Sequence, residues 1–324
     1  MKRRQFITLL AVTTTVRPRS LLAQQKGKVW RVGFLASSGE AFASGQKVLE
    51  PWVTKMRALG YVEGQNLTLD ARYAGGNNDL LPGLARELVA LKPDVILGSG
   101  TPAIYELQKL SSQIPLVMAP VNDPVGSGFV KSLANPGGNI TGVANMSTDY
   151  NPKTLELVRE LIPSAKCVAV LMSANASHPA MYQTLQKAAG ALGTELFAVT
   201  ARAAADLDAA FASITEAKCD AVIVQSDPPR PRIVTLAAAA RIPAVYQDGQ
   251  YVNEGGLAGY GPEFGALIAQ AATYVDRIFK GAQPADLPVE QPTVFLLRIN
   301  LKTANALGMN VSPILLNRAD QVIE

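Results

Sequence analysis

The two halves of this chain are weak copies of one another. The first half contains "KVWRVGFLASS", "LKPDVILGSGTPA" and "IPLVMAPVNDP", and the second contains "AKCVAVLMSAN", "AKCDAVIVQSDPP" and "IPAVYQDGQYV". Each segment is an apolar, β-rich run that ends in small polar residues, and helical stretches separate the runs. This alternation predicts parallel sheets with helices on both faces. Because the pattern occurs twice, it indicates two α/β lobes of similar architecture instead of one large sheet.

The polar residues that end these strands are candidates for a ligand site, because open α/β sheets bind ligands at the carboxyl ends of their strands. We expect the strand ends of both lobes to line a cleft between them. Any one of these residues could instead cap a helix or form a turn. Their matching places in two lobes favour a shared site. The candidates are Ser37, Ser38, Ser99, Thr101, Asn122 and Asp123 in the first lobe, and Ser173, Asn175, Ser226, Asp227, Gln247 and Asp248 in the second.

A glycine-dense stretch, "VNDPVGSGFVKSLANPGGNITGV", follows the third of these runs. It lacks the Gly-Lys-Ser/Thr ending of a phosphate-binding loop. Asp123 followed by Pro124 is typical of a helix start, so we expect "PVGSGFVKSLA" to form a short helix that ends at "NPGG". "NITGV" is then an extended run that crosses between the lobes. The glycines are therefore interpreted as turns and a hinge.

The segment "GSGTPA" has the G-x-G-x-x-A spacing of dinucleotide-binding loops, with Asp123 at about the distance of a ribose-binding acid. However, it follows a later strand and not the first, and Pro102 suits an ordinary helix start. We therefore expect no cofactor. A helix that begins at Thr101 would still offer backbone amides, from Thr101 to Ala103, to a ligand carboxylate.

Acid–base and metal chemistry have few candidate residues. The chain contains one histidine, His178 in "ANASHPAM", and no G-x-S-x-G nucleophile elbow. No His/Cys/Asp cluster has metal-ligand spacing. We expect His178 to be a loop residue near the mouth of the cleft, with no catalytic residue and no metal site.

The two cysteines occupy the same place in "AKCVAV" and "AKCDAV", so Cys167 and Cys219 should begin neighbouring parallel strands, at the end opposite the cleft. The favoured interpretation is two small buried hydrophobic side chains. The alternative is a disulfide, since an exported protein could oxidise two cysteines whose Cα atoms lie about 5 Å apart.

The N-terminus is typical of a targeting segment. Lys2, Arg3 and Arg4 precede an apolar run, residues 6–16, that is too short to span a bilayer. "KRRQFI" resembles a twin-arginine signal, and "LLAQQ" suggests cleavage after Ala23. The choice between Sec and twin-arginine export stays open. The alternative to a targeting segment is a basic N-terminal tail. Removing residues 1–23 lowers the formal net charge from +4 to −1, which gives no electrostatic reason to expect nucleic acid.

Taken together, these residues resemble the periplasmic substrate-binding proteins of ABC transporters, in the branch that includes tryptophan- and tyrosine-associated binders. The most specific segments are "LGYVEGQNLTLDARYAGG", "DPVGSGFVKSLANPGGNITGV", "GGLAGYGPEF", "AATYVDRIFKGAQPADLPVEQPTVFLLRINLKTANALG" and "LLNRADQVIE", and the resemblance runs from Val29 to Glu324. It implies an α/β fold of periplasmic-binding-protein type I, with two Rossmann-like lobes joined by three crossovers near "TGVAN", "GYGPE" and "LPVEQP". The expected division is a signal peptide at 1–23, lobe one at 28–141 plus 262–289, and lobe two at 142–261 plus 290–324.

The expected function is therefore solute capture for an importer: a monomeric, soluble periplasmic protein that delivers a small molecule to an ABC transporter permease and is not an enzyme. Aspartates at the strand ends opposite a helix start suit an amino acid or small carboxylate. The aromatic residues Tyr150, Tyr246, Tyr251 and Tyr260 could pack an aromatic or branched side chain, and Tyr260 joins the predicted site. The alternatives are an enzyme using the cleft, or a ligand-responsive regulator, which would need a DNA-binding helix-turn-helix before residue 28.

Overall fold

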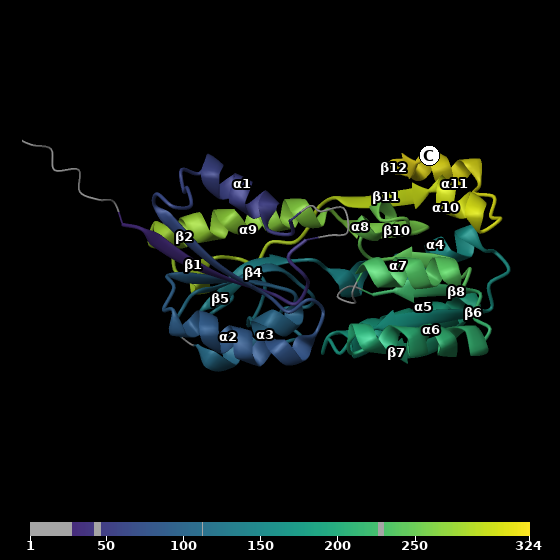
Figure 1. The fold of residues 1–324 in the computed structure, drawn as a ribbon, viewed down its shortest axis with the longest axis horizontal. Helices are drawn as coiled ribbons and strands as arrows, with labels where there is room; N and C mark the ends of the chain where they lie inside the picture. Colours follow the sequence, from purple (N-terminus) through teal and green to yellow (C-terminus); the bar gives the residue numbers. More distant parts are fainter. Residues whose placement is uncertain (1–27, 42–46, 112, 226–229) are drawn as a thin grey trace, which may run out of the picture.

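Two separate β-sheets organise the chain in the computed structural model, which describes residues 28–41, 47–111, 113–225 and 230–324 (Figure 1). The first sheet is wholly parallel and has the strand order β2-β1-β3-β4-β5. Its strands are β1 (Trp30–Ala36), β2 (Leu67–Tyr73), β3 (Val95–Ser99), β4 (Leu116–Val121) and β5 (Ile140–Ala144). Runs such as "VILGS" form central strands because both of their faces are covered by helices.

The second sheet has the order β12-β11-β10-β9-β8-β6-β7, and β10 and β11 form its one antiparallel pair. Its strands are β6 (Cys167–Met172), β7 (Glu195–Thr200), β8 (Ala221–Val224), β9 (Ala244–Tyr246), β10 (Ala258–Pro262), β11 (Phe295–Asn300) and β12 (Gln321–Ile323). The predicted parallel pattern therefore holds from β6 to β10, and the C-terminal segment extends this sheet.

Helices cover both faces of the first sheet. One face packs against α1 (Glu50–Ala58) and α9 (Phe264–Phe279), with Trp52 and Phe34 fully buried between them. The other face packs against α2 (Leu81–Ala90) and α3 (Thr101–Leu110). Short 3₁₀ turns, η1 (Asn78–Leu80) and η3 (Pro284–Asp286), complete this lobe. Figure 1 shows the sheet between these two pairs of helices.

The second sheet is covered in the same way. One face packs against α4 (Ser147–Leu161), α5 (His178–Leu192) and the short helices α10 (Leu301–Ala306) and α11 (Pro313–Arg318). The other face packs against α6 (Leu207–Glu216), which follows the turn η2 (Ala204–Asp206), together with α7 (Arg230–Ala239) and α8 (Gln250–Asn253). The sheet is buried between two helical layers, as the continuous apolar runs predict.

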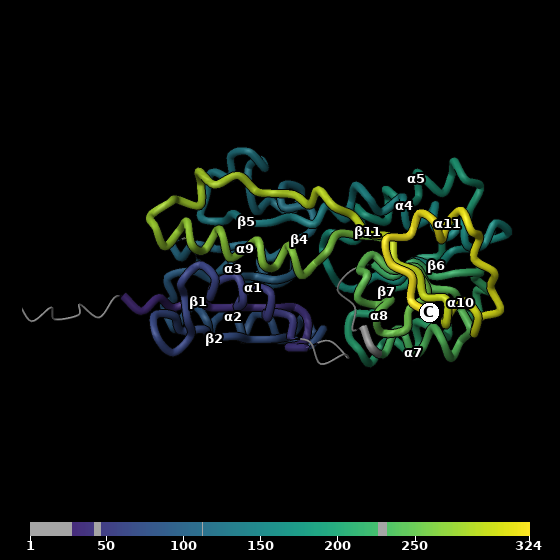
Figure 2. The backbone as a smooth tube through the Cα atoms, turned by 90° about the horizontal axis from the view of Figure 1, so that it is seen from above, coloured from purple at the N-terminus to yellow at the C-terminus, as the bar shows by residue number. Residues whose placement is uncertain are grey.

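The chain passes between the two lobes three times, after β5, after β10 and before β11 (Figure 2). Two of these crossovers are hydrogen-bonded to each other. The N–H of Ala144 donates to the carbonyl oxygen of Glu290 at 2.9 Å, and the N–H of Glu290 donates to that of Gly142 at 3.0 Å. The prediction of two Rossmann-like lobes joined by three crossovers is therefore confirmed.

The glycine-dense stretch differs from its prediction in one respect. No helix forms after Asp123; residues 124–128 form successive turns. The turn begins with the N–H of Ser127 donating to the carbonyl oxygen of Asp123 at 2.9 Å, but Gly128 adopts φ +73°, which ends it. "NITGV" is extended, as predicted, but it forms strand β5 of the first sheet, and the chain crosses to the second lobe only after this strand. At Gly142 a Cβ atom would lie 2.5 Å from the backbone of Met118, so only glycine allows β5 to approach β4 this closely.

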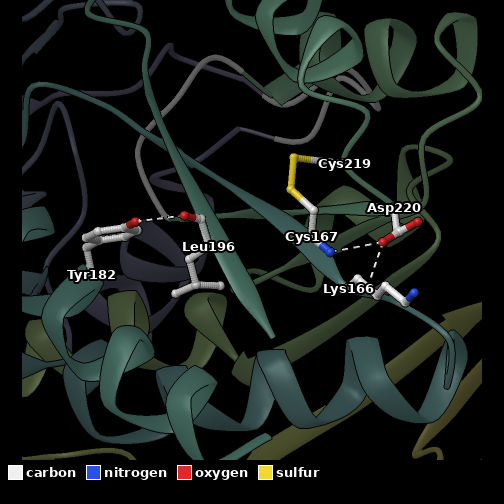
Figure 3. Close-up of a disulfide and its surroundings, with 6 residues drawn as sticks. All are labelled: Lys166, Cys167, Tyr182, Leu196, Cys219 and Asp220. Carbon is white, nitrogen blue, oxygen red and sulfur yellow. Dashed lines mark hydrogen bonds between the residues drawn. A yellow bond between two sulfur atoms is a disulfide. The ribbon is translucent and has the colours of Figure 1, made fainter. Parts of the chain in front are cut away.

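The two cysteines form a disulfide, with their Cα atoms 4.7 Å apart (Figure 3). Both residues are half-buried. The favoured interpretation of two buried hydrophobic side chains is therefore wrong, and the oxidised alternative is correct. Beside the disulfide, a carboxylate oxygen of Asp220 accepts the N–H groups of Lys166 at 2.7 Å and Cys167 at 3.0 Å, which ties together the beginnings of β6 and β8.

These two hydrogen bonds lead to a pH-dependent prediction. The N–H groups of Cys167 and Lys166 lower the pKa of the Asp220 carboxyl group below its usual value. A group with a lowered folded-state pKa stabilises the protein above its unfolded-state pKa, about 3.9, and this contribution is lost as the pH falls through the folded-state pKa. Because Asp220 is exposed, we expect Asp220→Ala to lower the free energy of unfolding at pH 7 by about 1 kcal/mol.

Urea unfolding at pH 7 and pH 3 measures this effect, and the difference from wild type should shrink at pH 3. Asp208→Ala is the matched control, since Asp208 forms an exposed ion pair with Arg232 and should have a smaller effect at pH 7. If the loss of unfolding free energy in Asp220→Ala were larger at pH 3 than at pH 7, the proposed role of the Asp220 carboxylate would be contradicted.

Candidate ligand-binding site

Three predicted serines meet at the carboxyl edge of the first sheet. The N–H of Ser37 donates to the carbonyl oxygen of Ser99 at 3.1 Å, and its hydroxyl donates to the same oxygen at 3.4 Å. The next serine along the chain, Ser38, is half-buried, and its hydroxyl donates to the carbonyl oxygen of Gly39 at 3.4 Å. The ends of β1 and β3 are therefore held side by side by backbone and hydroxyl contacts.

Thr101, at the start of α3, has a structural role that the sequence did not indicate. Its hydroxyl accepts the N–H of Asn122 at 3.0 Å and donates to the carbonyl oxygen of Asn122 at 3.5 Å, and the residue is 3% exposed. Pro102 has no N–H, and the N–H of Ala103 donates to the carbonyl oxygen of Gly100. The expected row of amides thus reduces to the N–H of Thr101, next to the half-buried Ser99.

Asp123 stabilises a turn. It adopts φ +30°, and its carboxylate accepts the N–H of Gly126 at 2.8 Å. Short polar side chains commonly accept a nearby backbone N–H in this way and so favour turns. The residue is half-buried and lies directly after Asn122, at the same edge of the sheet.

At the carboxyl edge of the second sheet, the segment after β6 is held by its own side chains. The side-chain oxygen of Asn175 accepts the N–H of Ser177 at 3.0 Å and its hydroxyl at 2.9 Å. The N–H of Ser173 donates to Nδ1 of His178 at 2.9 Å. His178 is 1% exposed and is the first residue of α5, so the expectation of a loop residue is wrong. Its ring packs against the strand end that precedes it.

The two edges touch each other. The side-chain amide of Asn122, after β4, donates to the hydroxyl of Ser177 at 3.1 Å and contacts the sulfur of Met181 at 3.7 Å, both at the beginning of α5. The sequence reasoning did not include Ser177 or Met181. Ser177 carried a signal, since "NASHP" is typical of a turn that leads into a helix; Met181 carried none. This contact brings the predicted strand ends of the two lobes next to one another.

Gln247 and Asp248 follow β9 and are buried. Gln247 is 0% exposed, and its side-chain amide donates to the side-chain oxygen of Asn151 on α4. Asp248 is 4% exposed and accepts the N–H of Gln250 at 2.9 Å, at the start of α8. The hydroxyl of Tyr150 donates to the carbonyl oxygen of Gln247 at 3.2 Å. Burial raises the pKa of Tyr150, so this hydroxyl stays protonated and remains a donor.

The other three tyrosines that were predicted to pack a ligand side chain lie in two different places. Tyr260, within β10, packs against Tyr150 and Phe295 and lines a surface groove of about 200 Å³ together with Lys153 and Arg318. Tyr246 and Tyr251 stack on each other at 4.5 Å inside the core that faces α6 and α7. Ser226 and Asp227 lie outside the described residues.

A larger groove, of about 470 Å³, opens beside the carboxyl ends of β6 and β7. Its lining includes Ser173, Asn175 and Thr200 from the strand ends and Tyr182 and Gln186 from α5. Its lining also includes the apolar residues Met172, Ala174 and Pro179. The groove belongs to the second lobe, at the same edge as the contact with Asn122.

Two kinds of feature are absent from the described part of the chain. No helix there has the length and apolarity needed to cross a membrane. No group of three or more His, Cys, Asp or Glu side chains there is arranged to hold a metal ion.

Comparisons with known proteins identify the family of this chain. The model of the family described as ABC transporter substrate binding protein matches residues 50–323. A curated tyrosine-binding protein of Clostridioides difficile is 28% identical over 269 residues, which is 81% of this chain and 77% of that protein. The solved structure of a conserved domain protein from Vibrio cholerae has a TM-score of 0.84 at 29% sequence identity. The match covers 91% of this chain and 100% of that chain. An ABC domain of Streptococcus pneumoniae solved in complex with L-Trp has a TM-score of 0.81 at 25% identity, over 91% and 99% of the two chains.

Proposed function

Because this chain belongs to the family of ABC transporter substrate-binding proteins, we propose that it captures an amino acid or a related small carboxylate, aromatic or branched, between its two lobes and delivers it to a membrane permease. The contact between Asn122 and Ser177 carries this proposal, since it joins the edges at which α/β sheets bind ligands. The ligand class is supported by two relatives, one named for tyrosine and one solved with L-Trp.

We propose that the start of α3 recognises the carboxylate group of the ligand. The N–H of Thr101 and the hydroxyl of Ser99 lie there, at the positive end of a ten-residue helix. The hydroxyl of Thr101 acts indirectly, by holding Asn122 in place at 3.0 Å. Ser37 and Ser38 support the same edge.

Recognition of the ammonium group is proposed for the aspartates. Asp248 is the stronger candidate because it is 4% exposed, so a charge pair there would be shielded from water. Asp123 lies on the opposite lobe and is half-buried. Each accepts a backbone N–H in a turn, and a carboxylate has about four acceptor sites.

Transport requires the lobes to open and close without any chemical change in the ligand. A ligand that contacts both lobes favours the closed arrangement over the open one, because it makes more contacts there. The lobes follow the two sheets, and the chain changes lobe after β5, after β10 and before β11. The hinge would include the paired crossovers around Ala144 and Glu290. In this proposal the protein is a monomer that works in the periplasm.

A thermal-shift screen tests the function. Protein lacking residues 1–23 is heated with each amino acid, with small aromatic and branched carboxylates, and with neutral sugars. A ligand present at about 100 times its dissociation constant adds about 2.7 kcal/mol of stability, which raises the unfolding temperature measurably. We expect stabilisation by at least one amino acid or small carboxylate; stabilisation by a sugar alone would refute the proposal.

Export gives a separate prediction, which concerns residues outside the described part of the chain. We expect the mature protein to begin near Gln24 and to be recovered from the periplasmic fraction, since a basic region, an apolar run and "LLAQQ" precede that residue. N-terminal sequencing of the fractionated protein measures this. Recovery from the cytoplasm with Met1 intact would show that the segment is not a signal.

A further inference from the structure

Gln225 lies at the carboxyl edge of the second sheet, directly after β8. Its N–H donates to the carbonyl oxygen of Leu171 at 3.0 Å, which continues the pairing of β8 with β6. Val224 pairs with Tyr246 on the other side, so the register places Gln225 between Met172 and Gln247. Neighbouring residues of a parallel sheet point to the same face. The side chain of Gln225 therefore lies on the face covered by α4 and α5.

The carboxamide of Gln225 is a buried polar group with no hydrogen-bond partner among the described residues. The residue is 0% exposed, and within the described residues neither its Nε2 nor its Oε1 has a hydrogen-bond partner. Its neighbour Gln247 is equally buried, but its amide donates to Asn151. Burying a carboxamide without partners is unfavourable, and the great majority of buried polar side-chain atoms have one. The group that satisfies Gln225 therefore lies outside the described residues, and a bound ligand can supply it.

The surroundings of Gln225 connect it to the contact between the lobes. Asn151, the partner of Gln247, donates its side-chain amide to the carbonyl oxygen of Met181 at 2.9 Å. The sulfur of Met181 in turn contacts Asn122 of the first lobe. Buried contacts thus run from Gln247, after β9, through Asn151 and Met181 to the first lobe. The carboxamide of Gln225 is next to Gln247 at one end of this series.

We propose that Gln225 determines ligand specificity by hydrogen-bonding an uncharged polar group on the ligand side chain. The inference rests on the proposed function and names the ligand class more closely. A carboxamide is uncharged and offers a donor and an acceptor together. It therefore complements a hydroxyl, which also donates and accepts, better than it complements the ammonium or carboxylate of an amino acid. Tyrosine fits this description, and phenylalanine does not.

Calorimetric titration with L-tyrosine and L-phenylalanine tests the proposal on three proteins: the mature wild type, Gln225→Leu and Thr194→Val. Wild type should bind tyrosine about tenfold more tightly than phenylalanine, which is the effect of one neutral hydrogen bond. Gln225→Leu should bind the two with affinities within about twofold of each other. Its unligated unfolding temperature should stay the same or rise, because an apolar side chain removes an unsatisfied polar group.

Thr194→Val is the matched control. The hydroxyl of Thr194 is also buried without a hydrogen-bond partner in the described chain, but it lies just before β7, at the opposite edge of the sheet. This variant should keep the preference for tyrosine. Gln225→Met, with a side chain of similar length, replaces Gln225→Leu if the latter does not fold.

Equal affinity of wild type for the two amino acids, or an unchanged preference in the Gln225 variants, would overturn the inference while the proposed function stands. Loss of unligated stability in both Gln225 variants would also overturn it, because the carboxamide would then have a structural role. If wild type binds no amino acid or small carboxylate in the thermal-shift screen, the proposed function fails and this inference fails with it.

Discussion

Removing the disulfide between Cys167 and Cys219 is expected to lower the free energy of unfolding by about 4 kcal/mol. The disulfide closes a loop with a sequence separation of 52, and the loss of chain entropy in the unfolded state gives about this value. Within that loop lie α5, β7 and α6, so the effect should be confined to the second lobe. The double variant Cys167→Ser with Cys219→Ser, unfolded in urea beside wild type, measures it.

A reductant provides the control for this prediction. Wild type treated with dithiothreitol should unfold like the double variant, and the double variant itself should not respond to the reductant. Ligand affinity should remain within about twofold of wild type, because the disulfide lies at the amino ends of β6 and β8, opposite the predicted site. If wild type had the same unfolding free energy as the double variant, and the reductant did not change it, the two thiols would not be joined.

Replacing Asp248 with Asn is expected to weaken amino-acid binding by about 100-fold. Loss of one partner of a buried charge pair costs about 2–5 kcal/mol, and about 2.8 kcal/mol corresponds to 100-fold in affinity. Asn keeps an oxygen that can accept the N–H of Gln250, so the substitution removes the charge with little change to the start of α8. Calorimetry on wild type and Asp248→Asn measures the loss.

The comparison that isolates the charge uses a matched pair of ligands, L-tyrosine and 3-(4-hydroxyphenyl)propionate, which differ in the ammonium group. Asp248→Asn should weaken binding of tyrosine much more than binding of the propionate. Asp220→Asn, at the opposite edge of the sheet, should leave both affinities unchanged. An equal loss for both ligands would mean that Asp248 shapes the site without contacting an ammonium.

Most of the fold could be predicted because its strongest signals are local. Apolar runs such as those of β3 and β8, each followed by small polar residues and a helix, indicate parallel strands without knowledge of tertiary contacts. The predicted helix after Asp123 failed for a local reason as well, since Gly128 adopts a left-handed conformation that ends the turns of residues 124–128 before they become a helix. The disulfide was left open because its formation depends on how closely two strands approach, which the spacing of the cysteines alone does not decide.

The site was less predictable than the fold. Sequence pattern placed Asn122 and Gln247 at strand ends, but it could not show that Thr101 binds the backbone of Asn122, because those residues are 21 positions apart and meet through folding. The same holds for Ser177, which meets Asn122 across the two lobes. Gln225 was passed over in favour of the polar residues after it, since its lack of partners is a property of the packed structure.

A crystal structure of the mature protein with the ligand that stabilises it most tests the central claim directly. We expect electron density for the ligand between the carboxyl edges of the two sheets, with its carboxylate near the N–H of Thr101 and with contacts from both lobes. Density confined to a groove of one lobe, such as the one lined by Asn175 and Tyr182 or the one lined by Tyr260, would contradict capture between the lobes.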